Sequence, residues 1–262
     1  FCINVSGLAV EMKKPMGFLL KIIITRGMKY IPLFFCLVFF VLSKALFAET
    51  GNNDYDFADS VIYQNGHRYF ILTMTRNPAT GFLYTGSGDG TIKEWDHNIL
   101  RRSFSGHIAP VTKVLMDEQR GHLISASIDM TIRIWDLDSG ESIATLVGHR
   151  QGIYAMALDS EGNLYSGDKE GTIMKWNLAT GEKIMENRVH DNTVYDLAVR
   201  EQGNMIYSIS RDGKLICLDD YTLLPIDTFL HRNTGPLFGL LYHPQRDEVI
   251  IGLDNGDVMG FS

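Results

Sequence analysis

Short apolar runs separated by glycine-containing turns recur along most of the chain. The turns follow one another at a spacing of about ten residues, which predicts successive β-hairpins and leaves almost no room for helices. The clearest stretch lies between residues 153 and 187, where turns such as Glu161–Asn163 separate four predicted strands. These strands are Ile153–Leu158, Leu164–Gly167, Thr172–Trp176 and Glu182–Asn187. The pattern predicts an all-β fold.

A longer repeat is superimposed on these hairpins. A tryptophan, or another apolar residue in its place, recurs at intervals of 40, 41, 42 and 43 residues, at Trp95, Trp135, Trp176, Leu218 and Phe261. A histidine lies 27 to 30 residues before each of these positions, at His67, His107, His149, His190 and His231. Two markers that recur in phase five times indicate five copies of one supersecondary unit.

The markers resemble those of the WD40 family. The segments GDGTIKEWD, ending at Asp96, and IDMTIRIWD, ending at Asp136, show it best, and the fourth and fifth units depart from the pattern. The resemblance covers roughly residues 55–262 and implies a WD40-type β-propeller with one four-stranded blade per unit. The segment from Asp59 to Gln64 resembles a fourth strand that completes the last blade. Five repeats are visible, and because seven blades are commoner in the family, a truncated seven-bladed propeller is the favoured alternative.

The N-terminal residues lie outside the repeat and have the pattern of a secretory leader. The chain begins with Phe1, and we favour Met28 as the start. A lysine, the apolar stretch Ile31–Leu42 and a small-residue region then follow, so cleavage is expected near Ala48. A retained membrane anchor over residues 30–48 is the alternative. The predicted domains are a leader at residues 1–48 and a propeller at residues 49–262.

Removing the leader changes the charge of the chain. Residues 49–262 hold 18 basic and 30 acidic side chains. A body this acidic repels phosphate backbones, which argues against nucleic acid as a partner. The leader-like pattern itself predicts an exported protein, periplasmic or extracellular.

Few residues outside the repeat suggest chemistry. Cys217 is the one cysteine after the leader, so no disulfide framework and no cysteine-based zinc site is expected. The histidines outside the repeat are not at metal-ligand spacing. The glycine-rich stretch Gly86–Gly90 lies in a predicted strand-to-strand turn, whereas a dinucleotide site needs a strand followed by a helix. No cofactor, metal or small-molecule substrate is therefore expected.

The recurrent histidine, hydroxyl and aspartate residues invite comparison with a catalytic triad. They recur once per unit, however, whereas an active site is singular. The resemblance implies that they form a chain of hydrogen bonds from the indole N–H through the hydroxyl and the imidazole to the carboxylate. The candidate set is His67, Ser87, Asp89, Trp95, His107, Ser127, Asp129, Trp135, His149, Ser166, Trp176, His190 and Asp212. The alternative hydroxyls are Thr85, Ser125 and, in the fourth unit, Ser208 or Ser210.

The set becomes less complete along the chain. In the third unit Glu170 stands at the position of the aspartate, and in the fourth Leu218 replaces the tryptophan. We therefore predict that the last two blades are the less stable ones. On this basis His107→Ala lowers the melting temperature more than His231→Ala.

The resemblance also implies a binding surface on the narrower top rim of the propeller. Matching residues on this chain follow the Gly-His marker or precede the turn acid. They are Thr112, Ile128, Tyr154, Lys169, Tyr195 and Arg211. Aromatic and arginine side chains bury much area in few rotamers, so Tyr154, Tyr195 and Arg211 are the preferred anchors.

These observations favour a non-catalytic protein–protein interaction scaffold that binds other proteins or peptides. One alternative is an exported enzyme or quinoprotein-like propeller, which needs a central cofactor pocket with calcium ligands. Another is a structural subunit of an envelope assembly complex. Contact with a membrane is expected only through an uncleaved leader.

Overall fold

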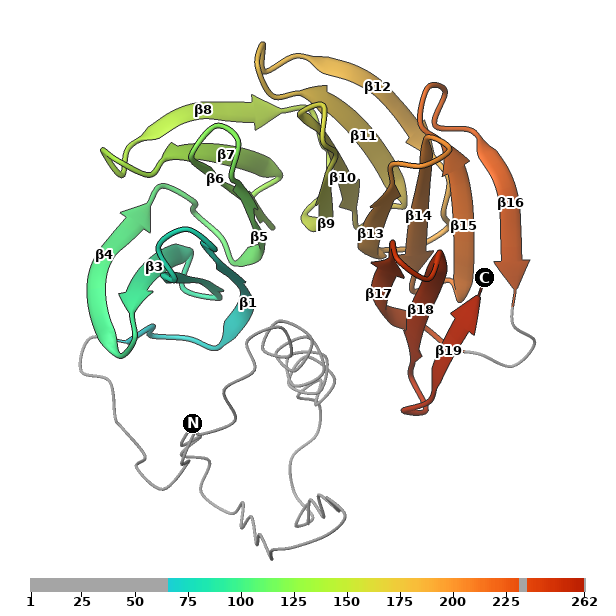
Figure 1. Cartoon of the computed structure of the whole chain (residues 1–262), viewed down its shortest axis with the longest axis horizontal. Coiled ribbons are helices and arrows are strands. Elements are labelled where there is room, and N and C mark those ends of the chain that lie inside the picture. Colours follow the sequence, from blue (N-terminus) through green and yellow to red (C-terminus); the bar gives the residue numbers. More distant parts are fainter. Residues whose placement is uncertain (1–65, 231–234, 262) are drawn as a thin grey trace, which may run out of the picture. The chain divides into compact units, whose positions relative to one another are not determined.

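The computed structural model describes residues 66–230 and 235–261, which all belong to the second of two compact units, Asn65–Ser262. These residues form nineteen strands and no helix (Figure 1), so none of them provides a helix able to cross a membrane. The predicted leader, the segment from Asp59 to Gln64 and His231 lie outside the described residues.

The strands form five antiparallel sheets, and strands that are consecutive in the sequence are neighbours in each sheet. The first sheet contains β1 (Ile71–Arg76), β2 (Leu83–Ser87), β3 (Thr91–Asp96) and β4 (Ile99–Ser105). The second contains β5 (Val111–Asp117), β6 (His122–Ser127), β7 (Thr131–Asp136) and β8 (Ser142–Val147), and the third β9 (Ile153–Leu158), β10 (Asn163–Asp168), β11 (Thr172–Asn177) and β12 (Lys183–Arg188). The fourth contains β13 (Val194–Arg200), β14 (Met205–Ser210), β15 (Lys214–Asp219) and β16 (Pro225–Leu230). The fifth has three described strands, β17 (Leu237–His243), β18 (Glu248–Leu253) and β19 (Val258–Phe261).

The strand prediction for the third unit is confirmed. Strand β9 has the predicted bounds, and β10, β11 and β12 differ from the prediction by one residue at one or both ends. The turns between them contain glycines with positive φ, such as Gly162 and Gly171 at 89° each. Glycine adopts this backbone conformation without steric penalty, which is why these residues terminate the strands.

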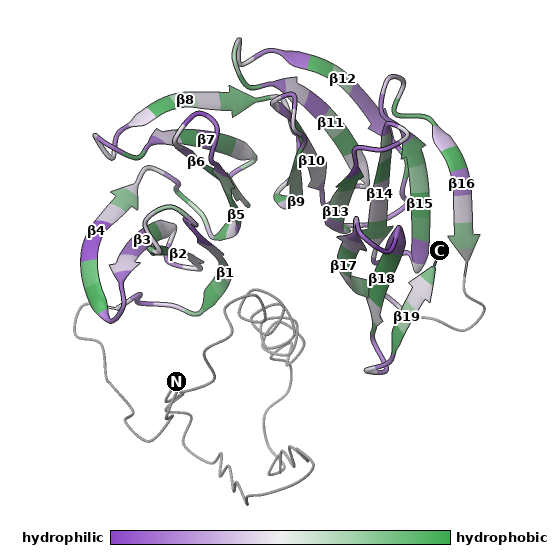
Figure 2. Ribbon diagram, in the orientation of Figure 1, coloured by the Kyte–Doolittle hydropathy of each residue, from purple (hydrophilic) through white to green (hydrophobic). Residues whose placement is uncertain are grey.

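Neighbouring sheets pack face to face through apolar side chains. The first strands β1, β5, β9, β13 and β17 contact one another in order. Tyr84 and Phe104 of the first sheet pack with Trp135 of the second, and Leu146 of the second packs with Trp176 of the third. Figure 2 shows hydrophobic residues concentrated in the inner strands, with more polar residues on the outer strands β4 and β12. The second, third and fourth sheets thus bury both faces against their neighbours, as a stack of repeats requires.

Candidate functional site

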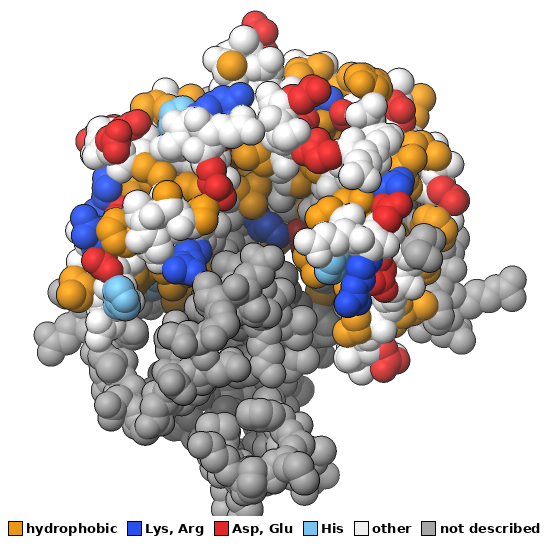
Figure 3. All heavy atoms as spheres, in the orientation of Figure 1, with side chains coloured by type: hydrophobic (Ala, Val, Ile, Leu, Met, Phe, Trp, Pro, Cys, Tyr) orange, Lys and Arg blue, Asp and Glu red, His pale blue; other side chains and the backbone are white. Residues whose placement is uncertain are grey.

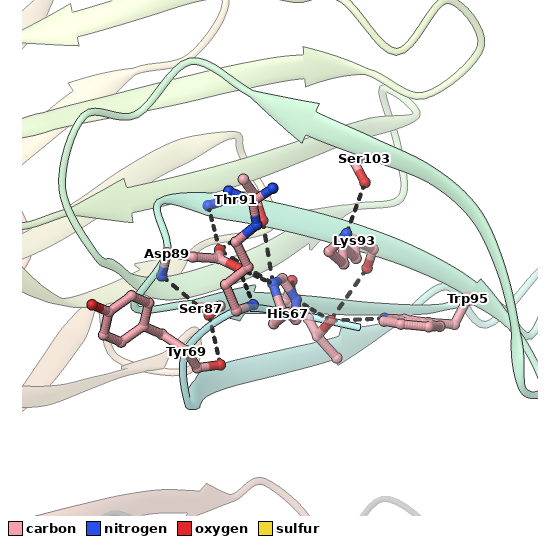
Figure 4. Close-up of polar contacts among 10 residues, drawn as sticks. His67, Tyr69, Ser87, Asp89, Thr91, Lys93, Trp95 and Ser103 are labelled. Carbon is pink, nitrogen blue, oxygen red and sulfur yellow. Dashed lines mark hydrogen bonds and ion pairs between the residues drawn. The ribbon is translucent and has the colours of Figure 1, made fainter. Parts of the chain in front are cut away.

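A chain of hydrogen bonds crosses the first sheet (Figure 4). The indole Nε1 of Trp95 donates to Thr85 Oγ1 at 2.8 Å, and the same hydroxyl lies 2.8 Å from His67 Nε2. His67 Nδ1 lies 3.1 Å from Asp89 Oδ2. Asp89 also accepts hydrogen bonds from the hydroxyl and backbone N–H of Thr91. These contacts hold the segment that precedes β1 against β2 and β3.

The second sheet repeats the arrangement. Trp135 Nε1 donates to Ser125 Oγ at 2.8 Å, and that oxygen lies 2.8 Å from His107 Nε2. His107 Nδ1 lies 2.8 Å from Asp129 Oδ2, and both side chains are almost fully buried. Unpaired polar groups at such depth would destabilise the fold.

The hydroxyls in these chains correct a prediction. Thr85 and Ser125 provide them, whereas the candidates Ser87 and Ser127 do not contact the indole or the imidazole. Ser87 and Ser127 instead donate to backbone carbonyls of the incoming connection, at 3.1 and 3.0 Å. Each also accepts the N–H of the turn aspartate, Asp89 or Asp129. The repeat thus carries two hydroxyls with two separate structural roles.

The third sheet has a complete chain with a different acid. Trp176 Nε1 donates to Ser166 Oγ at 2.8 Å, and His149 Nε2 lies 2.7 Å from that oxygen. His149 Nδ1 lies 2.8 Å from Asp168 Oδ2. Assigning Glu170 to the acid position was therefore wrong: Glu170 is exposed and accepts a hydrogen bond from Gln151.

Asp168 replaces two residues of the other sheets at once. It stands two residues after Ser166, the position that Ser87 holds relative to Thr85. Its Oδ1 accepts the N–H groups of Glu170 and Thr172, which Ser87 and Asp89 divide between them in the first sheet. Its other oxygen is left to pair with His149.

The fourth sheet retains most of the chain. His190 Nε2 lies 2.9 Å from Ser208 Oγ, and His190 Nδ1 lies 3.0 Å from Asp212. Ser210 bonds the backbone, as Ser87 does. Leu218 is fully buried at the position of the tryptophan, but its side chain has no N–H to donate. In the fourth sheet the chain of hydrogen bonds thus lacks only the indole donor. The lower stability of the last two blades stays a prediction, and His231 lies outside the described residues.

Burial and hydrogen bonds shift the pKa values of these histidines and aspartates. Burial lowers the pKa of His67 and of His107 below 6.5, against the opposing effect of their aspartate partners. Burial alone would raise the pKa of Asp89, but the hydrogen bonds from Thr91 and from the backbone N–H of Arg68 outweigh it and hold the pKa at about 2. The folded sheet therefore favours a neutral imidazole beside an ionised carboxylate.

These shifts predict two separate losses of stability on acidification. The unfolded chain binds protons on histidine below pH 6.5, before folded His67 and His107 do, so stability falls as the pH drops below that value. A second loss occurs between pH 3.8 and about 2, where Asp89 is protonated only when unfolded. Melting temperatures measured against pH should fall in both windows. In Asp89→Asn the second fall should be smaller than in the unchanged chain or in Asp138→Asn, and a melting temperature that rises below pH 6.5 would contradict the assignment.

The candidate rim residues Thr112, Tyr154 and Tyr195 occupy equivalent backbone positions. Each is the extra residue of a β-bulge near the start of the first strand of its sheet. Leu72 and Phe238 are the corresponding bulge residues of the first and fifth sheets. All five side chains are half-buried. A bulge redirects a side chain out of the regular pleat, which presents these residues at the same end of each sheet.

Tyr195 joins three of these residues into an aromatic row. Its ring stacks on Phe238, with centroids 4.9 Å apart. Burial raises the pKa of Tyr154, and the neighbouring Tyr195 adds to the shift. Burial also raises the pKa of Tyr195, and a hydrogen bond with Arg211 opposes that rise. The structure thus brings the three preferred anchors together.

The three remaining candidates, Thr112, Lys169 and Ile128, differ from this row in their contacts. Thr112 Oγ1 donates to the Ile153 carbonyl oxygen of the next sheet at 2.5 Å, so its hydroxyl fastens two sheets. Lys169 is exposed, and Ile128 is 37% exposed beside the third sheet. Phe238 escaped the sequence analysis because it lies seven residues after His231, whereas the other bulge residues lie five after their histidines.

The cavities hold none of the residues of these hydrogen-bond chains. A cavity of about 300 Å³ between the fourth and fifth sheets is lined by Gly213, Leu215, Thr228, Phe229, Leu237, Ile251 and Phe261, none of which is ionisable. Another, of about 240 Å³, is lined by Met116, Asp117, Glu118, Gln119, Arg120, Leu158 and Asp159. In the described part of the chain no group of three His, Cys, Asp or Glu residues could hold a metal ion.

Comparison with known proteins identifies the repeats. Residues 59–96, 98–136 and 140–177 match the family model of the WD domain, G-beta repeat. The chain is similar to Dynein assembly factor with WD repeat domains 1 of Rattus norvegicus, with 32% identity over 91 residues, 34% of this chain and 22% of the rat protein. It is also similar to Nuclear distribution protein nudF of Aspergillus niger, with 35% identity over 95 residues, 34% of this chain and 21% of that protein. Small ribosomal subunit protein RACK1 of Candida albicans shares 32% over 91 residues, 31% of this chain and 29% of that protein.

A solved structure supports the architecture. The crystal structure of the WD40 beta propeller domain of Doa1 superimposes with a TM-score of 0.67 at 22% sequence identity, covering 75% of this chain and 65% of that one. The chain spans less than a third of each of the three sequence relatives. The predicted fold class, all-β sheets of a WD40-type propeller, is thus confirmed for the described residues.

Proposed function

We propose that this chain, which contains WD40 repeats and folds into WD40-type blades, is a non-catalytic protein–protein interaction scaffold. The observation that carries the proposal is the recurrence of the His–hydroxyl–Asp chain in four sheets, at nearly the same distances each time. A group that repeats in every blade and bonds the blade's own tryptophan or backbone stabilises the fold. The members of these chains are thus occupied with one another, which argues against a catalytic role for them.

The top rim is the surface we assign to binding. It is formed, in each sheet, by the connection into the first strand and the turn between the second and third strands. The aromatic row Tyr154, Tyr195 and Phe238 lies there, and Arg211 is near enough to Tyr195 to oppose the rise in its pKa. Aromatic and arginine side chains of this kind contribute most of the affinity at protein interfaces.

The names of the relatives agree with this role. One relative is named a dynein assembly factor and another a small ribosomal subunit protein, so both names refer to assemblies of several components. Nucleic acid is not the partner we propose for this chain. On the face shown in Figure 3, basic side chains form separate groups among acidic and apolar ones, and the body of the chain is acidic.

The location that we propose is the periplasm or the cell exterior. The support is the leader-like pattern, with an apolar stretch at Ile31–Leu42 and small residues up to Ala48. N-terminal sequencing of the protein from its native source tests this part. A mature N-terminus near Glu49 is expected, and an uncleaved N-terminus on a protein recovered from the cytoplasm would overturn it.

Truncating the three preferred anchors is expected to weaken the binding of partner proteins. The triple variant Tyr154→Ala, Tyr195→Ala and Arg211→Ala should recover about tenfold less of the proteins that co-purify with the unchanged chain, because it removes the anchoring side chains. Quantitative mass spectrometry of the co-purified proteins measures this. Ile143→Ala, on the outer strand β8, is the matched control, since its side chain is 52% exposed but lies away from the rim. Equal recovery by the triple variant, with its fold intact, would remove the rim from consideration.

A further inference from the structure

An exposed apolar cluster covers the rim of the first two sheets and was not foreseen as a whole from the sequence. We call it the apolar rim cluster; its members are Tyr69, Phe70, Ile108, Ile128 and Met130. Their exposed fractions are 65%, 65%, 93%, 37% and 42% in that order. Single exposed apolar residues are ordinary, but a group of them at one end of a protein marks an interaction surface.

The members of the cluster are linked through backbone contacts. Side-chain atoms of Tyr69 and Phe70 lie beside Gly88, in the turn between β2 and β3. That turn reaches the next sheet at Gly90, where a side chain would come within 3.1 Å of the carbonyl oxygen of His107. Ile108 follows His107 directly. The turn of the first sheet therefore brings the two aromatic residues next to the apolar loop of the second.

The second half of the cluster is joined in the same way. The N–H of Ile108 donates to the carboxylate of Asp129, which lies between Ile128 and Met130 in the sequence. The N–H of Ile128 donates to the Pro110 carbonyl oxygen at 3.0 Å. The Ile128 side chain also packs against Gly152 of the third sheet. These contacts place the five residues on adjacent loops of the first two sheets, with Ile128 reaching the edge of the third.

Met130 occupies a strained backbone position. Its φ is +69°, and the equivalent residue of each other sheet is a glycine with positive φ, at Gly90, Gly171, Gly213 and Gly256. A residue with a side chain is disfavoured in this conformation. Strain retained at an exposed residue points to a role for the side chain itself, and Met130 presents a flexible apolar one that adapts to a binding partner.

Exposed cations lie on the same rim and form no ion pair with a carboxylate of the described residues, although Arg150 acts on Glu186 at longer range. Arg68, Arg150, Lys169 and Arg211 are exposed on the rim of the first four sheets, and none of them forms an ion pair among residues 66–230 and 235–261. The exposed acids of the same rim are engaged, since Glu170 accepts from Gln151 and Asp191 pairs with Lys214 at 2.7 Å. Two further exposed acids, Asp254 and Asp257, belong to the fifth sheet.

We propose that this surface binds an acidic peptide segment that inserts apolar side chains into the apolar rim cluster at Met130 and places its carboxylates against the cations around it. The inference rests on the proposed function and names the chemistry of the partner. A peptide fits better than an anionic membrane, because a flat bilayer would also meet the carboxylates of Glu170, Asp191, Asp254 and Asp257 at the same end.

Peptide binding to the full chain tests the proposal. The probe is a fluorescein-labelled peptide of about twelve residues in which Leu and Phe stand among Asp and Glu, measured by fluorescence anisotropy. We expect binding that weakens as salt is added. A peptide with Lys in place of the acids, a peptide with Ser in place of Leu and Phe, and vesicles of phosphatidylglycerol should each bind more weakly.

Met130→Gly separates binding from stability. Glycine relieves the strained backbone, so the melting temperature should not fall, while the Kd for the acidic peptide should rise about fivefold or more. Val147→Ser is the matched control, since Val147 is 72% exposed on the outer strand β8, and it should leave the Kd unchanged.

The outcomes distinguish this inference from the proposed function. Unchanged affinity in Met130→Gly, stronger binding of the basic peptide or of the vesicles, or no peptide binding at all would overturn the inference about the partner. None of these results affects the co-purification test, which asks whether the triple variant of Tyr154, Tyr195 and Arg211 still recovers the partner proteins. Equal recovery in that test would instead count against the binding surface assigned to Tyr154, Tyr195 and Arg211, whatever the peptide assay shows.

Discussion

Trp176→Ala is expected to destabilise the chain by about 4 kcal/mol, the range found for large aromatic residues removed from a packed core. The Trp176 side chain is 1% exposed and packs between the second and third sheets with Leu146 and Met174. A side chain at Gly148 would come within 2.8 Å of its ring, so the two surfaces fit closely. Equilibrium unfolding in urea measures the loss.

Two controls separate the roles of the indole. Trp176→Phe keeps most of the apolar contact but removes the N–H that donates to Ser166, so a smaller loss of about 1–2 kcal/mol is expected. Ile143→Ala removes an exposed side chain from β8 and should change stability by less than about 0.5 kcal/mol. If Trp176→Ala unfolds at the same urea concentration as Ile143→Ala, the ring does not hold the sheets together.

The second large effect concerns the acid of the third sheet. Asp168→Ala should destabilise the chain by about 3 kcal/mol, because it leaves His149 Nδ1 and the N–H groups of Glu170 and Thr172 without their acceptor. Glu170→Ala should change stability by less than about 0.5 kcal/mol, since Glu170 is exposed. Thermal unfolding of the two variants compares them directly. A larger loss in Glu170→Ala would restore the assignment that the sequence pattern favoured.

The sequence was most informative where one pattern repeats. The period of about 40 residues and the spacing of the glycine turns predicted the sheets, and in the third unit the strands to within one residue. Alternation of side chains explains why the hydroxyl was assigned wrongly. Thr85 and Ser87 are two residues apart on β2 and therefore face the same side of the sheet. Only the positions of the Trp95 and His67 side chains in the folded structure show which hydroxyl they contact.

Other features depend on geometry that spacing does not encode. In the third unit Ser166 follows its histidine by 17 residues rather than 18, and Asp168 takes over contacts that two residues share elsewhere. The β-bulges that present Tyr154, Tyr195 and Phe238 together arise from strand pairing. Met130 did leave a signal in the sequence, a methionine where the other units have glycine, but its meaning depends on the positive φ.

The central claim is that the recurrent polar residues stabilise the blades, whereas the rim binds the partner proteins. Ser166→Ala tests it most directly, because Ser166 is fully buried in β10 and its hydroxyl bonds only His149 and Trp176 among the described residues. Thermal unfolding is measured on one preparation, and binding of the acidic peptide is measured on the same preparation well below its melting temperature. The account predicts a large fall in melting temperature with the Kd of the folded protein unchanged. An unchanged melting temperature together with lost binding, or with loss of a measurable turnover, would contradict it.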